Sequence, residues 1–488
     1  MAYGITYPNL NAMILVNDNL QGKEERTMPL IGAFIVPHPP LIVPEIGKGM
    51  EAGVQMTIDA YEEVARRIAA LRPDTIVLSS PHASGYADYI QISPDQRAEG
   101  TFRDFGAPGV HIALDYDVEF SALLGKLAEK SDIPAGTLGE KEGKLDHGTL
   151  VPLYFINHAW RDYALVRVAI SGLSPLTHYR FGKCIAEAAK ESGKRVVMVA
   201  SGDLSHKLTK DGPYGLAEEG AVFDHEVTEA LANGDFLRLL SFEEGFCEAA
   251  AECGLRSFQI MAGTLDGKAV VPELLSYEGP FGVGYAVAAY DVVGDDGSRR
   301  FDQKFEEEEA LRLEMEKAGE DHFVRLARMS LENFVRTGHY VRKPDSLPED
   351  LTRQKAGVFV SLKMEGRLRG CIGTISPVTS TIADEIIQNA VSAGTMDPRF
   401  APVQEHELPW LVYSVDVLGE AERISSLEEL EVSRYGVIVH SKGRQGLLLP
   451  NLHGVDTPQE QVSIALEKAG IPSDVPYIME RFEVIRHK

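Results

Sequence analysis

Residues 197–206 read Val197-Met-Val-Ala-Ser-Gly-Asp-Leu-Ser-His206, a short apolar run followed by a turn that ends in a histidine. Comparable apolar runs occur at 31–36, 75–79 and 110–114, and longer helical stretches occur at 50–71, 118–130, 181–192 and 217–232. Short strands that alternate with longer helices are typical of α/β domains. The sequence therefore predicts an N-terminal α/β domain over 29–293, with a parallel or mixed sheet and a final apolar stretch at 283–293.

Two other histidines share the position of His206 just past a predicted strand. His38 follows in Ile35-Val-Pro-His38-Pro-Pro, and His82 follows in Ile76-Val-Leu-Ser-Ser-Pro-His82. A single histidine in such a place is more often a hydrogen-bonded loop residue. Ligands of open α/β sheets, however, collect outside the carboxyl ends of the strands. Three imidazoles in equivalent positions therefore favour one shared site.

Two imidazoles and one carboxylate form the facial triad of non-haem Fe(II) oxygenases, which leaves positions open for substrate and dioxygen. Glu278 is a candidate for the carboxylate, because it lies in an apolar, glycine-flanked segment where an acid is costly to bury; alternatively, it is an exposed turn residue before a strand. Glu45 and Asp203 are the competing acids. His147 precedes an apolar helix, and it could reach the site from the helix N-terminus. Alternatively, Asp146 or Thr149 caps that helix and His147 faces solvent.

A second pattern follows the first domain. Residues 294–319 are rich in turn residues and then in charge, which predicts a linker and a charged helix. From 320 to 488 the pattern is mixed, with helical stretches at 382–393 and 459–469 and strand-like runs at 358–362 and 411–418. We expect a smaller α+β C-terminal domain there. Residues 1–28 are interpreted as a mobile arm or as a mis-assigned start, since Met28 immediately precedes the first strand.

Composition excludes several classes of function. The 488 residues carry 48 Lys and Arg against 73 Asp and Glu, a formal charge of −25, which disfavours binding to nucleic acid or to an anionic membrane surface. No apolar run approaches the roughly 18 residues of a membrane span. The cysteines form no CxxC pair, so neither a disulfide framework nor a cysteine-rich zinc site is expected, and we expect a cytoplasmic protein. There are four of them: Cys184, Cys247, Cys253 and Cys371.

Four ordered motifs carry a family resemblance. His38-Pro-Pro, Ser80-Pro-His82, Asp146-His147-Gly-Thr and Gly202-Asp-Leu-Ser-His206 resemble those of the class III extradiol ring-cleavage dioxygenases of LigB type and their Memo-type relatives. The resemblance implies an Fe(II) cofactor with His38, His82 and Glu278 as ligands. It also implies His206 as the acid/base and His147 as a substrate contact. Asp203 stands where the dioxygenases usually have glycine, which is closer to the Memo-type pattern.

The C-terminal region is similar to another family. Leu368-Arg-Gly-Cys-Ile-Gly, Asp397-Pro-Arg-Phe-Ala-Pro and Gly443-Arg-Gln-Gly-Leu-Leu-Leu-Pro resemble the AMMECR-type domain. Arg369, Cys371, Asp397 and Arg399 could line a cleft. Alternatively, Cys371 is a small buried residue and Asp397 and Arg399 lock a turn.

Together, the two resemblances imply a dioxygenase that cleaves a catecholic or related small aromatic substrate with O2. The alternative is a Memo-like metal-binding or redox-accessory protein without catechol cleavage, which would act on a modified peptide or beside another protein. Fusions of these two domain types resemble proteins of systems that include a radical SAM protein. That resemblance implies a radical SAM partner for this chain.

Overall fold

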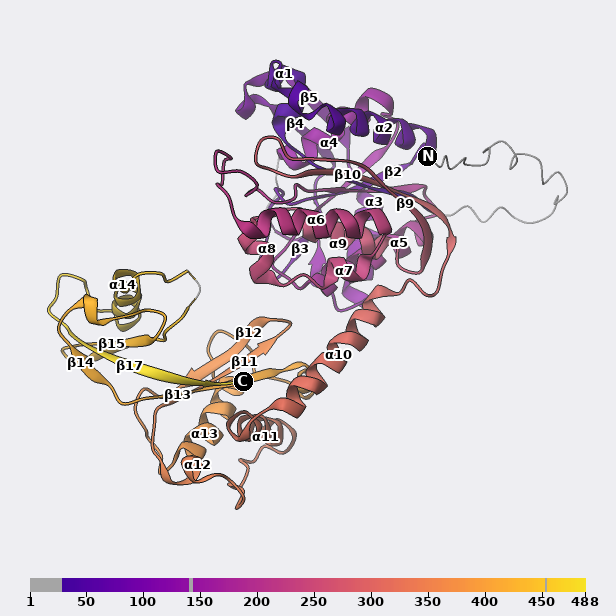
Figure 1. Ribbon diagram of the computed structural model, residues 1–488. Coiled ribbons are helices and arrows are strands. Elements are labelled where there is room, and N and C mark those ends of the chain that lie inside the picture. Colours follow the sequence, from indigo (N-terminus) through magenta and orange to yellow (C-terminus); the bar gives the residue numbers. More distant parts are fainter. Residues whose placement is uncertain (1–28, 140–143, 453) are drawn as a thin grey trace, which may run out of the picture. The chain divides into compact units, whose positions relative to one another are not determined.

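The computed structural model describes residues 29–139, 144–452 and 454–488, which form two compact units (Figure 1). The first unit ends at Asp302, and the second runs over Gln303–Lys488. The expectation for residues 1–28 lies outside the described residues. Among the described helices, none combines the length and the apolar character needed to cross a bilayer.

A six-stranded mixed sheet forms the centre of the first unit, in the strand order β7-β2-β8-β1-β10-β9. Strands β7, β2, β8 and β1 run parallel, whereas β10 and β9 are antiparallel additions at one side. This arrangement confirms the predicted α/β domain. The strands are β1 (Leu30–Val36), β2 (Thr75–Ser80), β7 (Ala164–Ala169), β8 (Val196–Ser201), β9 (Lys268–Glu278) and β10 (Tyr285–Asp295).

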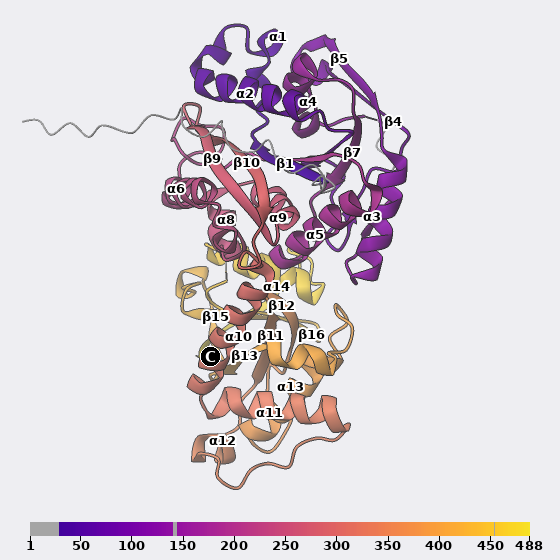
Figure 2. The same cartoon turned by 90° about the vertical axis from the view of Figure 1, so that its right-hand side faces the viewer.

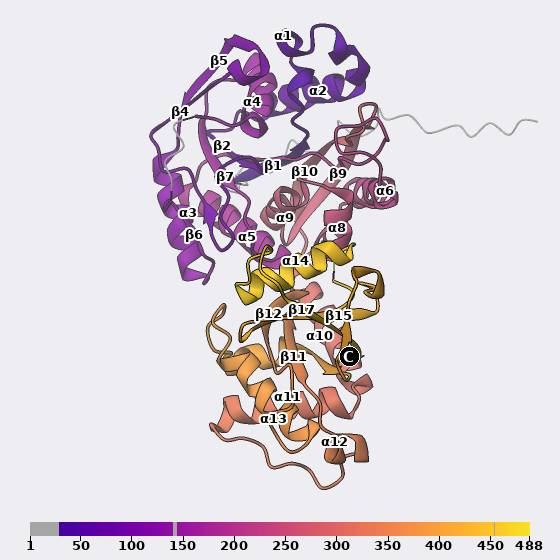
Figure 3. The ribbon, with the colours of Figure 1, turned by 90° about the vertical axis from the view of Figure 1, so that its left-hand side faces the viewer.

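Helices cover both faces of this sheet, as Figures 1 and 3 show. Helices α2 (Gln55–Leu71) and α4 (His147–Ala159) pack together on one face, and α5 (Pro175–Ser192) and α9 (Leu255–Thr264) pack together on the other. Every residue of β8 is buried between these layers, as expected for a central parallel strand. The remaining helices are α1 (Pro44–Gly47), α3 (Val118–Lys130), α6 (Glu218–Asn233), α7 (Phe236–Leu240), α8 (Glu244–Ala250), η1 (Pro40–Ile42), η2 (Met50–Val54) and η3 (Arg103–Phe105).

The sequence misplaced one strand of this unit. The run 110–114 lies in β5 (Ala107–Asp115), which pairs with β4 (Arg97–Phe102) in a separate antiparallel ladder. Several β5 side chains are exposed, whereas β7, at the edge of the main sheet, is almost wholly buried. A strand covered on both faces needs apolar side chains on both, and β5 lacks them. A short ladder of β3 (Ile90–Gln91) and β6 (Ala135–Gly136) lies outside the main sheet too.

The second unit contains an antiparallel sheet with the strand order β12-β11-β13-β17-β15-β16, in which β14 also pairs with β17. Helices α11 and α13 pack on the β11 to β13 part, and α14 packs on β15 and β16 (Figure 2). This confirms the predicted α+β domain. Its strands are β11 (Val358–Met364), β12 (Arg367–Gly373), β13 (Val412–Leu418), β14 (Glu422–Ile424), β15 (Tyr435–Ser441), β16 (Arg444–Leu448) and β17 (Ile478–His487).

Helix α10 (Phe301–Gly319) contains the charged segment that the sequence analysis assigned to a linker. It begins just before the division between the two units, and nearly all of it belongs to the second. The other helices of that unit are α11 (His322–Thr337), α12 (Glu349–Arg353), α13 (Ile382–Thr395), α14 (Pro458–Ala469), η4 (Glu405–Trp410) and η5 (Leu427–Glu429).

Candidate metal centre

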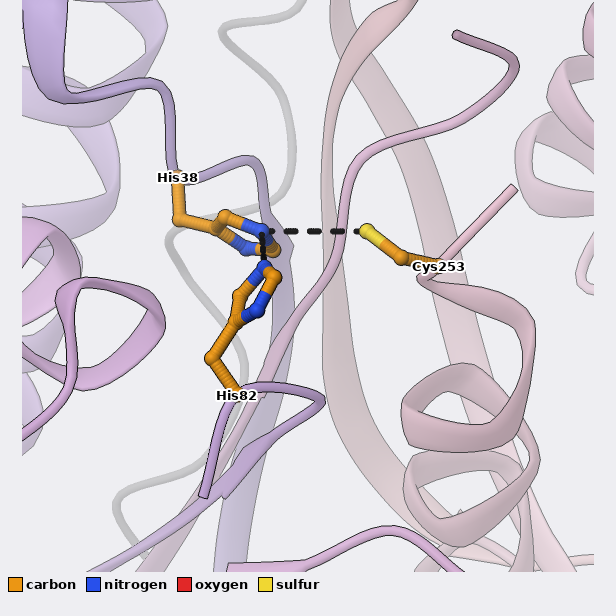
Figure 4. A group of neighbouring side chains, drawn as sticks. All are labelled: His38, His82 and Cys253. Atoms are coloured by element: carbon orange, nitrogen blue, oxygen red, sulfur yellow. Dashed lines mark hydrogen bonds between the residues drawn. The ribbon is translucent and has the colours of Figure 1, made fainter. Parts of the chain in front are cut away.

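Three side chains with metal-binding atoms meet at the carboxyl ends of the parallel strands. His38 follows β1 and His82 follows β2, and their Nε2 atoms lie 3.0 Å apart. The Sγ of Cys253 lies 3.7 Å from His38 Nε2. Figure 4 shows this sulfur pointing toward the His38 ring, with the His82 ring beside it. These ligand atoms all lie within 4.8 Å of one another. Two imidazoles and a thiol so close together form a set that suits a borderline metal ion such as Zn²⁺ or Fe(II), or the soft ion Cu(I).

The surroundings of His38 fix which of its nitrogens faces this set. The Ser201 hydroxyl donates to the Gly148 carbonyl over 2.6 Å, so its oxygen must accept from His38 Nδ1, 3.0 Å away. His38 Nε2 therefore carries a lone pair, which is the form that binds a metal. Burial and then the neighbouring imidazoles lower the pKa of His38, which keeps this buried ring neutral.

Replacing Ser201 with alanine tests this orienting contact. We expect metal affinity to fall by about 10–100-fold, since the hydrogen bond that selects the ligand tautomer is lost. The stability cost should be about 1–3 kcal/mol, because the Gly148 carbonyl is left without its donor. Metal titration and thermal unfolding measure the two effects. Ser330→Ala, which removes a buried hydroxyl bonded to the Leu326 carbonyl of the second unit, is the control and should change stability alone.

Asp203 lies close to His38 and Cys253 and is almost fully buried. Its Oδ1 accepts a hydrogen bond from the His38 backbone N–H at 2.8 Å, and its Oδ2 is 3.8 Å from His38 Nε2. Burial raises the pKa of Asp203 to about 7. A neighbouring cation would favour the ionised carboxylate, so metal binding at this place would release a proton.

His206 lies beside Asp203 in the loop that follows β8. Its Nδ1 must donate to the Ala251 carbonyl, 2.6 Å away, because a carbonyl can only accept. The Nε2 of His206 therefore carries the lone pair, as it does in His38. With Asp203 and Cys253, this histidine forms a second set of ligand atoms within 4.8 Å of one another. The exposed ring of Tyr214 packs edge-on against His206, with 5.2 Å between the ring centroids.

Cys253 is the site residue that the sequence analysis missed. It stands between α8 and α9, and its sulfur accepts a hydrogen bond from the Asp203 backbone N–H at 3.4 Å. The two loops can approach because Gly202 and Gly254 face each other. A Cβ on Gly202 would lie 2.2 Å from the Gly254 Cα. Burial, followed by Asp203 and Glu252, raises the pKa of the Cys253 thiol well above its ordinary value.

His147 occupies the first turn of α4, and Asp146 caps that helix by accepting from the Thr149 backbone N–H at 3.0 Å. The capping alternative is therefore right, but His147 does not simply face solvent. Its ring lies 4.1 Å from the His82 ring and 5.4 Å from the His38 ring, measured between centroids. Burial, followed by the His82 charge, lowers the pKa of His147 to about 4, so the ring is neutral at pH 7.

The expected carboxylate ligand, Glu278, is not part of either set, and the structure corrects that assignment. Glu278 Oε1 accepts from both the backbone N–H and the hydroxyl of Thr57, each at 2.7 Å. Thr57 lies in the first turn of α2, where free backbone donors attract a carboxylate. The competing Glu45 is exposed and bonds to the Tyr154 hydroxyl. Of the three candidate acids, only Asp203 belongs to a set of metal-binding atoms.

In the second unit, most of the residues that the sequence analysis placed in a possible cleft form ion pairs or hydrogen bonds instead. Asp397 accepts hydrogen bonds from the Cys371 backbone N–H at 2.9 Å and from the Arg399 side chain at 2.7 Å, so the turn-locking interpretation holds. The Arg399 guanidinium holds the pKa of Asp397 well below its usual range. Arg369 forms a bidentate pair with Glu407. Cys371 is half-buried, with the Ser361 hydroxyl 3.3 Å from its sulfur.

Two family models match this chain, one in each unit. Residues 32–288 match the family model described as the catalytic LigB subunit of aromatic ring-opening dioxygenase, and residues 324–487 match AMMECR1. A Clostridium acetobutylicum protein, CA_C1420, is 43% identical over 472 residues, which cover 94% of this chain and 100% of that protein. A Thermotoga maritima protein is 46% identical over 172 residues, 35% of this chain and 99% of its own length. The crystal structure of the uncharacterized Escherichia coli protein JW3007 aligns at 17% identity and a TM-score of 0.35, over 54% of this chain and 99% of that one.

Proposed function

Because this chain belongs to the family of the catalytic LigB subunit of aromatic ring-opening dioxygenase, with an AMMECR1 domain fused to it, we propose that its first unit is an Fe(II)-dependent dioxygenase. Its substrate would be a catechol or a related small aromatic diol. The observation that supports this proposal is the meeting of His38, His82 and Cys253 at the carboxyl ends of the parallel strands. Ring opening places both atoms of O2 in the product, so no other reductant is required.

The residues present fit a ferrous ion. His38, His82 and Cys253 would hold it through two neutral nitrogens and one sulfur, with Asp203 beside them. When bound, the ion would bring the diol and dioxygen together and pass electrons between them. His82 is exposed, so the ion would be reachable from solvent. The partly exposed Phe105 ring packs against His147 and borders the same region, where an aromatic substrate could contact both rings.

His206 would move the proton. Burial lowers the pKa of His206 below its ordinary value, so the ring is neutral at pH 7 and its Nε2 can accept a proton from a substrate hydroxyl. The bond from Nδ1 to the Ala251 carbonyl keeps the ring oriented for this step and stabilises the charged form that results. The same nitrogen can return the proton when the ring opens. His147, held neutral by its surroundings, would contact the substrate without charge.

Oxygen consumption tests the proposal. The protein is loaded with Fe(II) without air, mixed with a panel of catechols and then exposed to O2. We expect O2 uptake with ring-opened product. His206→Asn should lower kcat by about 10²–10⁴-fold, since it keeps the Nδ1 position and removes the Nε2 base. Iron held by His38, His82 and Cys253 should remain. His225→Asn, on the exposed side of α6, is the control. An iron-loaded protein that leaves every catechol unchanged would contradict the proposal.

One observation favours a second candidate. A thiol takes the place expected for a carboxylate in the ligand set, and thiolate ligands suit metals that are carried or exchanged as well as metals that activate O2. The second candidate is therefore a Memo-like metal-binding or redox-accessory protein, acting on a modified peptide or beside a radical SAM partner. Metal retention without any O2 uptake in the experiment above would favour it.

A further inference from the structure

We infer that Asp203, His206 and Cys253 form a second metal position beside that of His38, His82 and Cys253, and that both positions share the Cys253 sulfur. The two sets of ligand atoms are separate except for that sulfur, and in each set all atoms lie within 4.8 Å of one another. A carboxylate oxygen, an imidazole nitrogen and a thiolate together suit a divalent ion of borderline softness, such as Zn²⁺ or Co²⁺.

The ligand atoms of this second position are oriented in the way that metal ligands usually are. His206 donates from Nδ1 to a backbone carbonyl, which is the contact that fixes a metal-binding imidazole in its Nε2 form. Asp203 is held through Oδ1 by the His38 backbone N–H, so its Oδ2 can turn to an ion. An ordinary loop histidine needs neither a fixed tautomer nor a buried acid so close to its ring.

Cys253 lies where a bridging sulfur would have to be. Its Sγ is 3.7 Å from His38 Nε2, and two ligands held about 2.0–2.3 Å from one tetrahedral ion stand roughly that far apart. The same sulfur belongs to the set of Asp203 and His206. A thiolate has several lone pairs and can bind two ions at once. The Asp203 backbone N–H, 3.4 Å away, orients the sulfur between the two sets.

A second ion would have a consequence for the proposed reaction. The Nε2 lone pair of His206 cannot hold an ion and accept a proton at the same time. If the function proposed above is correct, an ion in the second position therefore switches off proton transfer while leaving the first position filled. The metal count described next does not depend on that reaction, so the two ideas can fail separately.

Cobalt provides the test, because each Co²⁺ bound to a thiolate adds charge-transfer absorbance in the near ultraviolet. The full chain is titrated with Co²⁺ without air, and the metal that survives dialysis is measured by elemental analysis. We expect about two ions per chain. His206→Asn and His82→Asn should each retain about one, and the double variant should retain almost none. Cys253→Ser should weaken both positions and remove the charge-transfer band.

Two control variants match these changes. His225→Asn and Cys247→Ser lie outside both sets and should keep about two ions. The number of ions bound by the unaltered protein can overturn the inference even if a variant folds poorly. A single ion per chain would overturn the inference, whether His206→Asn leaves it bound or releases it. Two ions that both survive in His206→Asn would also overturn it, since the second ion would then lie elsewhere.

Discussion

His38→Asn should abolish metal binding by the set of His38, His82 and Cys253 while leaving the fold intact. The asparagine amide can occupy the place of Nδ1 and still donate to Ser201, but it has no atom at the place of Nε2. We expect affinity to fall by at least about a hundredfold, because changes to residues behind the ligands already cost 10–100-fold. Metal titration and thermal unfolding of the metal-free protein are the measurements.

His225→Asn makes the same chemical change on an exposed surface and should bind metal normally. Equal metal loss in both variants would mean that binding does not depend on the convergence of His38 and His82. Unchanged binding in His38→Asn would exclude His38 as a ligand, and the proposed centre would have to be abandoned.

Asp146→Ala should cause the largest loss of stability among the changes considered. Asp146 Oδ2 accepts from Arg167 at 3.2 Å, and the Arg167 side chain is only 1% exposed. Asp146 also caps α4 and accepts from the Ser80 hydroxyl beneath the His82 turn. Removing the acid takes away a counter-charge of a buried cation together with the helix cap, which costs about 3–5 kcal/mol. Denaturant unfolding of the metal-free protein measures this loss.

Two further variants separate the buried charge from the lost helix cap. Asp235→Ala removes the exposed cap of α7, and it should cost about 0.5–2 kcal/mol at most. Adding Arg167→Leu to Asp146→Ala should recover part of the loss, because the buried cation that Asp146 helped to neutralise is then gone. If Asp146→Ala costs no more than Asp235→Ala, the ion pair with Arg167 contributes little.

Part of the main sheet of the first unit was readable from the sequence, which indicated β1, β2, β8 and β10 but not β7 or β9. Helix α3 has the bounds that the pattern predicts, and β1 and β2 each differ from the prediction by one residue at one end. Continuous apolar runs identify strands that helices cover on both faces. The run at 110–114, which lies in β5, was wrongly expected in the main sheet. Some of its side chains are exposed and others are buried, and such a pattern does not reveal which sheet a strand joins. The expected helix at 50–71 also divides, into η2 and α2.

The sequence was less informative about acids and thiols. Glu278 was chosen because an acid in an apolar segment needs a partner, but that argument does not say which partner. In the structure its partner is Thr57 at the start of α2, where a helix needs an acceptor. Cys253 carried no signal, because it forms no CxxC pair with Cys247 and follows a short helix rather than a strand of the sheet.

The sequence by itself therefore determined the two families, the two fold classes and the placing of His38 and His82 at one edge of the sheet. The carboxyl ends of parallel strands lie together whenever the sheet forms, so residues just after them meet without further information. Only the tertiary structure decided that Cys253 joins them and Glu278 does not. That choice depends on the close approach of Gly202 and Gly254, which brings together two loops of different elements. Such a contact is set by packing of the whole unit, and no local pattern around Cys253 records it.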